Sequence, residues 1–326
     1  MKLSHDRSRM RRITQAHEFG KVAVLYGGTS TEREVSLASG AAVLAALKRR
    51  GIDATGVDPR DEALTELARR GFDRACIVLH GPGGEDGSLQ GALELIGMPY
   101  TGSGVMGSAL GMDKLRTKRL AAAVGVATAE SVVLKTPADC EQALQRLGLP
   151  MIVKPATQGS SVGMTKVTTA AELEPAFRAA AALDDSVFAE KWITGAEYTV
   201  AVLHRRVLPA IRIEVPNGFY DYEAKYKRND NKYHIPAGLS AQAEAHMASL
   251  ALATFDAIGA EGWGRVDFMA DHTGRPLLLE INTVPGMTDH SLVPKAAAAA
   301  GIDFEELCWQ ILESSFVREP KREDAR

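Results

Sequence analysis

The sequence predicts an α/β and α+β fold that begins with a doubly wound parallel sheet. Short apolar runs alternate with helical patterns over residues 21–80, as is typical of parallel strands joined by helices. Further along, residues 266–270 and 277–282 are two strand-like runs joined by the turn-forming residues 271–276, which predicts an antiparallel hairpin. At 326 residues, the chain is long enough for two or three domains.

The predicted hairpin gathers polar side chains on one face. With Ala270 opposite Leu277, alternation of the side chains gives a polar face on which Asp267 is opposite Glu280 and Arg265 is opposite Asn282. The other face is apolar and carries Val266, Phe268, Leu279 and Ile281. Two carboxylates and an amide oxygen suit Mg²⁺ better than Zn²⁺. A solvated face with scattered charges is the alternative, but the adjacent Arg265 and the Gly- and Pro-containing loop 283–291 favour a metal site.

Three apolar runs in the N-terminal part are expected to be parallel strands. They are residues 21–26, 52–57 and 75–80, with helices expected over residues 32–51 and 61–70. Ligands bind such sheets at the carboxyl ends of the strands, where this chain has loops rich in glycine and polar residues. We therefore expect Glu32 and His80 to face one crevice. Each is also compatible with a structural role, as a carboxylate in a first helical turn or a histidine at a strand end.

The middle of the chain contains a second candidate binding loop. Asp113 is expected to cap a helix that runs to residue 124, with Lys114 near its start. A hairpin of residues 151–155 and 164–167 then encloses a loop rich in glycine and serine. The N–H groups of such a loop can hold phosphate oxygens, and Lys154 adds a positive charge. A flexible hairpin tip explains the same residues equally well.

Residues 187–193 and 197–203 predict two further strands. Glu190 and Glu197 flank an apolar segment there, which could hold an adenosine; a pair of surface glutamates is the alternative. The polar connection 217–237 contains four tyrosines, which favour a lid over a disordered insert. Helices are also expected over residues 170–183, 247–258 and 304–316.

Composition excludes several classes of protein. The net charge of −3 provides no basic field for nucleic acid. No apolar run approaches the roughly 18 residues of a membrane helix. The three cysteines show no metal-binding spacing, so we expect reduced thiols in the cytoplasm. Residues 1–20 are expected to be a disordered basic tail with no secretory signal; a presequence or a nucleic-acid-binding arm is the less favoured alternative.

One glycine motif is set aside. Residues 102–107 (GSGVMG) match the dinucleotide fingerprint G-x-G-x-x-G, but they follow a turn-like segment and no acidic residue ends a strand about 20 residues later. The chain also has no Walker lysine motif. A nicotinamide-dependent reductase or a P-loop enzyme is therefore disfavoured.

A series of ordered segments between residues 21 and 316 resembles the D-alanine–D-alanine ligases of the ATP-grasp superfamily. The segments are GGTSTEREVS, HGPGGEDGSLQG, PYTGSG, MDK, VKPATQGSSVGM, EKWITG, YDYEAKY, GWGRVDF and LLEINTVPGMTDHSLVP. The resemblance implies an N-terminal Rossmann-like (preATP-grasp) domain at 21–103, a central ATP-grasp subdomain at 104–194 and a C-terminal ATP-grasp domain at 195–326 with the lid loop 217–237.

The resemblance also implies an activity. ATP phosphorylates the carboxylate of one D-alanine, and the amine of a second D-alanine attacks the acyl phosphate to form D-alanyl-D-alanine for peptidoglycan precursors. A cytoplasmic homodimer that uses ATP and two Mg²⁺ ions, with Mn²⁺ as an alternative, is implied as well. The partners are then the small molecules ATP and D-alanine, with no nucleic acid and no membrane.

The resemblance assigns the ATP and metal contacts residue by residue. The ATP phosphates contact Lys114, Lys154 and the lid residue Lys225, and are covered by the loop residues Gly159, Ser160, Ser161 and Val162. Adenosine contacts Glu190, Lys191, Trp192, Ile193 and Glu197. The metal ligands are Asp267, Glu280 and Asn282, as the hairpin register also indicates.

The substrate contacts follow in the same way. Glu32 binds the ammonium group of the first D-alanine, with His80 nearby, and Arg265 and the Gly286 N–H stabilise the oxyanion. Ser291 and Leu292 contact the carboxylate of the second substrate. A hydrogen-bonded trio of Glu32, Ser160 and Tyr226 links the N-terminal domain, the phosphate loop and the lid.

Other readings remain. A ligase that takes D-lactate or D-serine as its second substrate is the nearest; Tyr226 argues against D-lactate and leaves D-serine open. A catalytically silent nucleotide-binding protein would be expected to lack a metal ligand or a phosphate-binding lysine, and all are present. Val284 departs from the small polar residue expected there, and no side chain is assigned as the base for the attacking amine.

Overall fold

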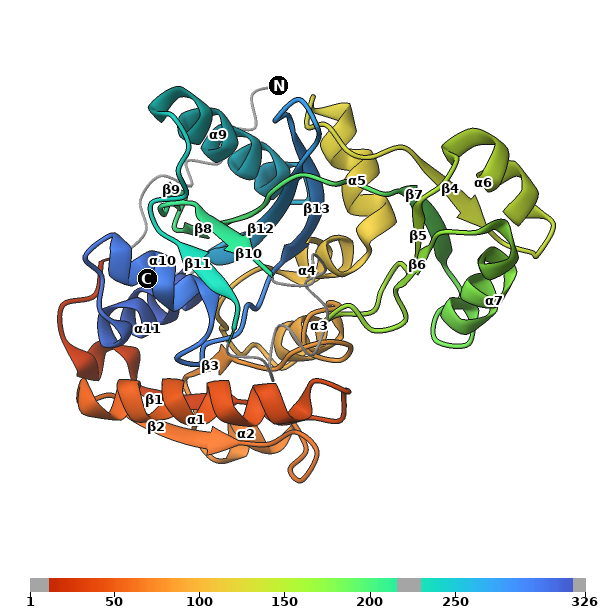
Figure 1. The fold of residues 1–326 in the computed structure, drawn as a ribbon. Coiled ribbons are helices and arrows are strands. Elements are labelled where there is room, and N and C mark those ends of the chain that lie inside the picture. Colours follow the sequence, from red (N-terminus) through yellow and green to blue (C-terminus); the bar gives the residue numbers. More distant parts are fainter. Residues whose placement is uncertain (1–11, 216–229, 319–326) are drawn as a thin grey trace, which may run out of the picture.

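Three β-sheets surrounded by helices form the framework of the chain (Figure 1). The structure is a computed structural model that describes residues 12–215 and 230–318. The first sheet lies with α1 at the bottom of the view, the second lies with α6 and α7 at the right, and the third lies between them, beneath α9. This arrangement of mixed parallel and antiparallel sheets agrees with the predicted α/β and α+β class.

The first sheet has three parallel strands with β1 in the centre. Its strands are β1 (Lys21–Leu25), β2 (Asp53–Val57) and β3 (Arg74–Ile77). The helices of this part are α1 (Arg33–Arg49), α2 (Glu66–Arg69), α3 (Ser88–Leu95) and α4 (Val105–Met112). The parallel pairing predicted from the alternation of strands and helices is confirmed.

The helix predicted over residues 61–70 is wrong for most of its length, because α2 has only four residues. The N–H groups of Asp61 and Glu62 both donate to the Asp58 carbonyl oxygen, which closes a turn. The Asp58 carboxylate also pairs with Arg33 at 2.7 Å. Turn hydrogen bonds and this ion pair to the start of α1 therefore fix a segment whose composition also suits a helix.

The second sheet is antiparallel, in the order β4-β7-β5-β6. Its strands are β4 (Ser131–Leu134), β5 (Met151–Pro155), β6 (Thr165–Val167) and β7 (Val187–Lys191). Two helices pack against it, α6 (Asp139–Leu147) and α7 (Ala170–Ala181). The preceding helix α5 (Lys114–Ala123) is capped by the Asp113 side chain, which accepts a hydrogen bond from the Arg116 N–H, as predicted.

The third sheet has six strands and is also antiparallel. They are β8 (Glu197–Leu203), β9 (Arg206–Val207), β10 (Ile211–Glu214), β11 (Lys232–His234), β12 (Trp263–Ala270) and β13 (Pro276–Asn282). Helix α9 (Ala241–Ala257) packs against it, and α10 (Leu292–Ala299), α11 (Phe304–Glu313) and the 3₁₀ helix η2 (Ser314–Arg318) complete the described chain. Strand β11 falls within the predicted loop 217–237, so that prediction is wrong for residues 232–234, which pair with β10. Residues 217–229 lie outside the described residues.

The predicted disordered tail is ordered from residue 12 onward, so this prediction is wrong for residues 12–20. The segment ends in the 3₁₀ helix η1 (Ala16–Phe19). Phe19 is fully buried, and its ring meets Trp309 of α11 edge-on at 4.8 Å. The N–H of Ile13 donates to Glu313 at 2.8 Å. The prediction followed the basic composition of the segment, whereas the burial of Ile13 and Phe19 favours an ordered structure.

The two ends of the described chain share one hydrophobic core. Helix α11 packs against α1, where Arg49 pairs with Glu305 at 2.7 Å and Arg50 pairs with Glu306 at 2.9 Å. Side chains of the first sheet and of α10 and α11 belong to the same buried cluster. The loop between β13 and α10 is therefore held close to the carboxyl ends of β1 and β3.

The hairpin of β12 and β13 has the predicted pairing at its functional end and a different pairing at its turn. Asp267 faces Glu280 and Arg265 faces Asn282, as predicted. Ala270, however, faces Pro276 rather than Leu277, because a β-bulge next to Asp267 shifts the register by one residue.

The bulge also corrects the predicted apolar face of this hairpin. Leu278, opposite Phe268, is fully buried in the cluster with Val266 and Ile281. Leu279 is the extra residue of the bulge and lines a pocket instead. Simple alternation of side chains therefore assigned Leu279 to the wrong face.

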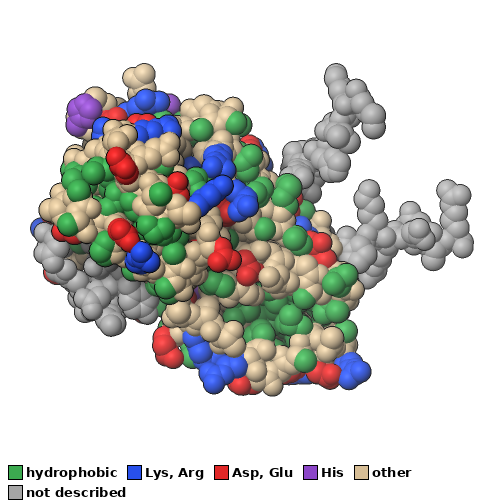
Figure 2. All heavy atoms as spheres, turned by 90° about the vertical axis from the view of Figure 1, so that its right-hand side faces the viewer, with side chains coloured by type: hydrophobic (Ala, Val, Ile, Leu, Met, Phe, Trp, Pro, Cys, Tyr) green, Lys and Arg blue, Asp and Glu red, His purple; other side chains and the backbone are tan. Residues whose placement is uncertain are grey.

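Charge and burial agree with the composition of the chain. In Figure 2, Lys and Arg side chains are interspersed with Asp and Glu over the face shown. No helix within residues 12–215 and 230–318 is long and apolar enough to cross a membrane. Cys76, Cys140 and Cys308 are free and buried, and burial raises the pKa of the Cys76 thiol to about 12.

His204 ties the turn between β8 and β9 to the last helix. Its ring Nε2 faces the Gln310 carbonyl oxygen of α11, and its backbone is left-handed with φ of 50°. Burial lowers the pKa of the imidazole below its ordinary value, although the Gln310 carbonyl opposes this shift. As pH falls, the His204 imidazole of the unfolded chain therefore takes up a proton near the ordinary histidine pKa of about 6.5. The imidazole of the folded chain does so only at a lower pH.

We predict that the contribution of His204 to the free energy of unfolding falls as pH decreases from about 7.5 to about 5.5. The variant His204→Asn tolerates a positive φ and carries no titrating ring. Urea unfolding of both proteins at the two pH values measures the effect. The variant should lose less stability than the wild type between them, and equal losses would show that His204 makes no such contribution.

Candidate active site

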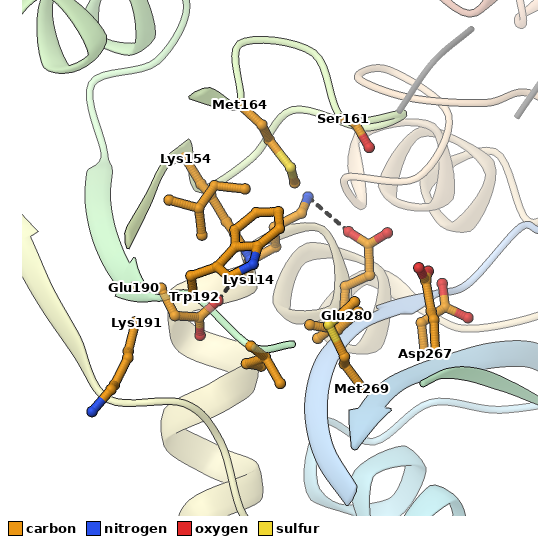
Figure 3. Close-up of a pocket in the computed structure, with 14 residues that line it drawn as sticks. Lys114, Lys154, Ser161, Met164, Glu190, Lys191, Trp192, Asp267, Met269 and Glu280 are labelled. Atoms are coloured by element: carbon orange, nitrogen blue, oxygen red, sulfur yellow. Dashed lines mark hydrogen bonds and ion pairs between the residues drawn. The ribbon is translucent and has the colours of Figure 1, made fainter. Parts of the chain in front are cut away.

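A pocket lies between the second and third sheets (Figure 3). The second sheet contributes β5 and β7 to its wall, and the third contributes β12 and β13. The lining residues are Lys114, Ile152, Lys154, Ser161, Met164, Glu190, Lys191, Trp192, Ile193, Glu197, Asp267, Met269, Leu279 and Glu280. Eight of these were predicted as nucleotide-binding residues and two as metal ligands. The pocket thus has lysines on one wall and carboxylates on the other.

Glu190 forms the charged back of the pocket. Its side chain is 1% exposed and lies between Lys154, at 2.7 Å, and Lys118, at 2.6 Å. Burial alone would raise the pKa of the Glu190 carboxyl, but the two ammonium groups hold that pKa below its ordinary value. Burial lowers the pKa of Lys118, and the Glu190 carboxylate opposes this change. Glu190 is therefore a buried residue of the pocket lining rather than a surface glutamate, and its contact with adenosine stays a prediction.

The opposite wall carries the carboxylates of the hairpin. Asp267 accepts hydrogen bonds from Arg265 at 2.8 and 2.9 Å and from the Thr199 hydroxyl at 2.6 Å. Asn282 donates to Asp267 at 3.2 Å. Glu280 faces Lys114 across the pocket at 3.2 Å, as Figure 3 shows. Side chains of the protein therefore balance both negative charges.

The three predicted metal ligands do come together. Asp267 and Glu280 are directly opposite on paired strands, and Asn282 touches Asp267. Their side chains can offer only oxygen donors to a metal ion, once the Asn282 amide turns its oxygen inward. Arg265 and Lys114, which face these carboxylates, supply positive charge at the same place. Because all of its donors are oxygen atoms, the set of Asp267, Glu280 and Asn282 fits a hard divalent cation such as Mg²⁺.

The glycine- and serine-rich loop 156–163 reaches Glu32 at the start of α1. Ser160 and Ser161 are left-handed, with φ of 51° and 60°, and the Ser160 hydroxyl donates to the Glu32 carboxylate. A Cβ at Gly159 would lie 2.4 Å from a Glu32 oxygen, so a larger residue there would displace the Glu32 carboxylate. Two of the three members of the predicted trio are thus in contact, and Tyr226 lies outside the described residues.

His80 holds the loop that follows β13. Its Nδ1 faces the Val284 carbonyl oxygen at 2.8 Å, and its Nε2 lies 3.3 Å from the Ser39 hydroxyl. Ser39 also accepts a hydrogen bond from the Met287 N–H at 3.0 Å. Burial lowers the pKa of His80, while the nearby Glu32 opposes the shift. The ring is therefore best described as neutral, with its proton on Nδ1.

Glu85 holds the other side of the Val284 peptide. Its two carboxyl oxygens accept from the Gly81 N–H at 2.7 Å and from the Val284 N–H at 3.2 Å. Burial and the neighbouring Glu32 raise the pKa of the Glu85 carboxyl to about 8. Val284 is only 4% exposed, so an apolar residue suits this position. The departure from the family pattern therefore packs into the core and leaves its backbone groups paired.

The last predicted residues lie where this loop enters α10. Ser291 is the N-cap residue of α10, and its hydroxyl accepts from the Thr288 N–H at 2.9 Å. A Cβ at Gly286 would lie 2.9 Å from that hydroxyl. Leu292 is buried. The loop from Asn282 to Ser291 therefore has a fixed shape next to the hairpin carboxylates.

The predicted nucleotide-binding residues differ in how they meet the pocket. Trp192, Ile193 and Glu197 line it. The Lys166 ammonium lies over the Trp192 ring, 4.2 Å from the ring centre. Lys191 is exposed and points away from the cavity in Figure 3. Val162 does not line the pocket. The predicted lid contact Lys225 lies outside the described residues.

The sequence interpretation missed four polar residues that organise this site. Lys118 could have been found, because it is one helical turn after Lys114 and shares its face. Glu85 stood within a quoted motif but received no role. Thr199 and Ser39 carried no local signal, since their contacts depend on strands and loops far away in the sequence.

Two family models match the chain. The model described as "D-ala D-ala ligase N-terminus" matches residues 58–103, and "D-ala D-ala ligase C-terminus" matches residues 120–313. A D-alanine–D-alanine ligase from Alkalilimnicola ehrlichii is 57% identical over 308 residues, which are 94% of this chain and 98% of that protein.

Two solved structures have a similar fold. A D-alanine–D-alanine ligase from Bacillus anthracis, complexed with ATP, has a TM-score of 0.80 and 31% identity, and the match covers 92% of this chain and 98% of that chain. The VanG D-Ala:D-Ser ligase from Enterococcus faecalis has a TM-score of 0.78 and 31% identity, covering 90% of this chain and 99% of that chain.

We predict that Ser39→Ala lowers the free energy of unfolding by about 1–3 kcal/mol, because it leaves the buried Met287 N–H without its acceptor. Urea unfolding measures the change. Glu34→Ala, on the exposed side of the same helix, is the control and should stay within about 0.5 kcal/mol of the wild type. A Ser39→Ala protein as stable as this control would contradict the described role of Ser39.

Proposed function

Because the chain belongs to the D-alanine–D-alanine ligase family, we propose that it joins two molecules of D-alanine with ATP bound in the pocket between the second and third sheets. It is an ATP-dependent ligase. The observation that carries the assignment of the site is the opposition of Lys114 and Lys154 to Asp267 and Glu280 across one pocket. Phosphoryl transfer depends mainly on positioning and charge neutralisation, which this arrangement supplies.

In this proposal the nucleotide lies between β5–β7 and β12–β13. The adenosine end contacts the apolar lining near Trp192 and Ile193, with Glu197 beside it, and the phosphates extend toward Lys114 and Lys154. N–H groups of residues 159–162 cover the phosphates from the N-terminal side. The polar and apolar ends of the observed pocket support this direction.

Mg²⁺, or Mn²⁺ in its place, would be held by Asp267, Glu280 and Asn282, and two such ions are proposed. When bound, the ions neutralise charge on the phosphate oxygens. Lys114, which pairs with Glu280 here, would contact the phosphate. Thr199 and Arg265 keep Asp267 in its orientation.

The first D-alanine is proposed to bind between the first sheet and the loop after β13. The buried Glu32 carboxylate accepts its ammonium group. One carboxylate oxygen takes the phosphoryl group from ATP, which releases ADP. Arg265 and the Gly286 N–H then stabilise the oxyanion that forms when the second amine attacks the acyl carbon, and phosphate leaves with the former carboxylate oxygen.

The second D-alanine is proposed to place its carboxylate near Ser291 and Leu292, at the start of α10. Its attacking amine must lose a proton, and both ring nitrogens of His80 already have protein partners. We therefore propose no role for His80 as the base. D-serine is the second candidate for this position, because the VanG D-Ala:D-Ser ligase has the same fold at 31% identity.

The finer organisation is also a proposal. We propose domains at 21–103, 104–194 and 195–326, and a homodimer in the cytoplasm. The exposed apolar side chains Leu95, Val105 and Met106 on α3 and α4 support an association surface there. The three free, buried cysteines support a reducing compartment.

Phosphate release from ATP, with the mass of each product, tests this function. D-alanine should give phosphate and D-alanyl-D-alanine, and L-alanine should give neither. Adding D-serine or D-lactate to D-alanine tests the alternatives, because a mixed product formed in preference to D-alanyl-D-alanine would reassign the second substrate. Binding of ATP without turnover of any of these substrates would contradict the ligase assignment.

We predict that Glu280→Gln lowers kcat by at least about 100-fold, because one charge that neutralises the metal ions is lost. Steady-state kinetics over a Mg²⁺ titration measures this, and a thermal unfolding curve shows whether the fold is kept. Glu174→Gln, on the exposed face of α7, is the control and should behave as the wild type. Rates like those of the wild type at saturating Mg²⁺ would remove Glu280 from the metal site.

Tyr226→Phe tests the proposed trio with Glu32 and Ser160. Loss of the hydroxyl should slow ligation, because the lid loses a hydrogen bond to the phosphate loop. Single-turnover kinetics with D-alanine measures the ligation step directly. Unchanged kinetics would remove Tyr226 from the site.

A further inference from the structure

We propose that Lys118 is a positioning residue that keeps Lys154 available to the nucleotide and holds the bulged strand of the metal site. Lys118 lies on α5, one turn after Lys114, so both side chains leave the same face of the helix. Lys118 is 3% exposed and is not among the residues that line the pocket. This inference rests on the proposed nucleotide site.

The first half of the proposal concerns charge. Glu190 alone would pair fully with Lys154, and the two charges would cancel at the back of the pocket. Lys118 binds the other oxygen of the same carboxylate at 2.6 Å, so the group of three side chains has an excess positive charge. An anionic nucleotide can then take Lys154 as a partner without leaving Glu190 buried and unpaired, which would be costly.

The second half concerns the bulge in β13. The Lys118 ammonium also donates to the Leu278 carbonyl oxygen at 2.6 Å. Leu278 lies beside the extra residue Leu279, where the ladder between β12 and β13 changes register. The Leu278 N–H donates to the Ala127 carbonyl oxygen, so the backbone groups of Leu278 face away from β12, and Lys118 contacts the carbonyl on that side. The same side chain therefore fixes the strand that carries Glu280 two residues later.

Lys118 thus joins the two walls of the pocket. Glu190 belongs to β7 in the second sheet, and Leu278 belongs to β13 in the third. A single ammonium group contacts both, at 2.6 Å in each case. The distance between the adenosine wall and the metal wall is therefore set in part by a residue that touches neither ATP nor metal.

The variant Lys118→Met keeps the length of the side chain and removes its charge and its donors. We expect it to weaken ADP binding by about tenfold or more, which corresponds to the loss of one or more charged hydrogen bonds. Isothermal titration calorimetry with ADP measures this without turnover. KM for ATP should rise in parallel, while KM for D-alanine at saturating ATP should change less than about twofold, because the amino-acid site lies outside this contact.

Three further variants separate positioning from a general loss of structure. Lys118→Arg keeps the charge and the donors and should restore ADP binding to within about threefold of the wild type. Arg119→Met removes the exposed neighbouring charge on the same helix and should leave ADP binding unchanged. In Glu190→Gln the Lys118 ammonium has no carboxylate to neutralise. Adding Lys118→Met to this variant should therefore weaken ADP binding by much less than it does in the wild type.

The double variant also covers the case in which Lys118→Met alone does not fold, since it removes both buried charges of that pair together. Wild-type affinity for ADP in Lys118→Met would overturn the proposal. Equal effects of Lys118→Met with and without Glu190 would overturn its electrostatic half. Failure of the proposed function would appear differently, because the wild-type protein itself would then show no ADP binding or no ligase product.

Discussion

The antiparallel pairing of Asp267 with Glu280 is the constraint on which the rest of the site depends. It places two carboxylates side by side on strands β12 and β13, and a bulge between them and the hairpin turn keeps the buried face apolar. The bulge also turns Leu279 into the pocket, and Lys118 donates to the carbonyl oxygen of the neighbouring Leu278. Lys114 approaches this pair of carboxylates on one side, and the loop that contains Gly286 lies on the other.

The charges of the site are better explained by function than by stability. Buried ion pairs contribute little net stability, because desolvation offsets their attraction. Here Lys114, Lys118, Lys154 and Arg265 are each held against a carboxylate by short contacts within the described part of the chain. A pocket of this kind is ready for an anionic ligand and its cation, since both can exchange with charges that are already in place.

The sequence predicted the framework and most of the lining because those features are local. Alternating apolar runs gave the parallel strands β1 to β3, and the alternation within β12 and β13 gave the face shared by Asp267 and Glu280. Ordered motifs gave Lys114, Lys154 and Glu190.

What the sequence could not predict depends on distant contacts. The bulge at Leu279 arises from packing of Leu278 beneath the sheet, and simple alternation cannot reveal it. Residues 12–20 are ordered by α11, nearly 300 positions away, so their own composition was misleading. Thr199 and Ser39 have no motif, and their roles follow only from the side chains and loops that folding brings to them.

The central claim is that the lysines and carboxylates of this pocket transfer the γ-phosphoryl group of ATP to a carboxylate of D-alanine. The most direct test uses D-alanine labelled with ¹⁸O in its carboxylate and measures the mass of the phosphate released. If an acyl phosphate forms, phosphate leaves with one carboxylate oxygen and carries one ¹⁸O for each peptide bond made. Unlabelled phosphate, formed at the same rate as the dipeptide, would contradict the mechanism.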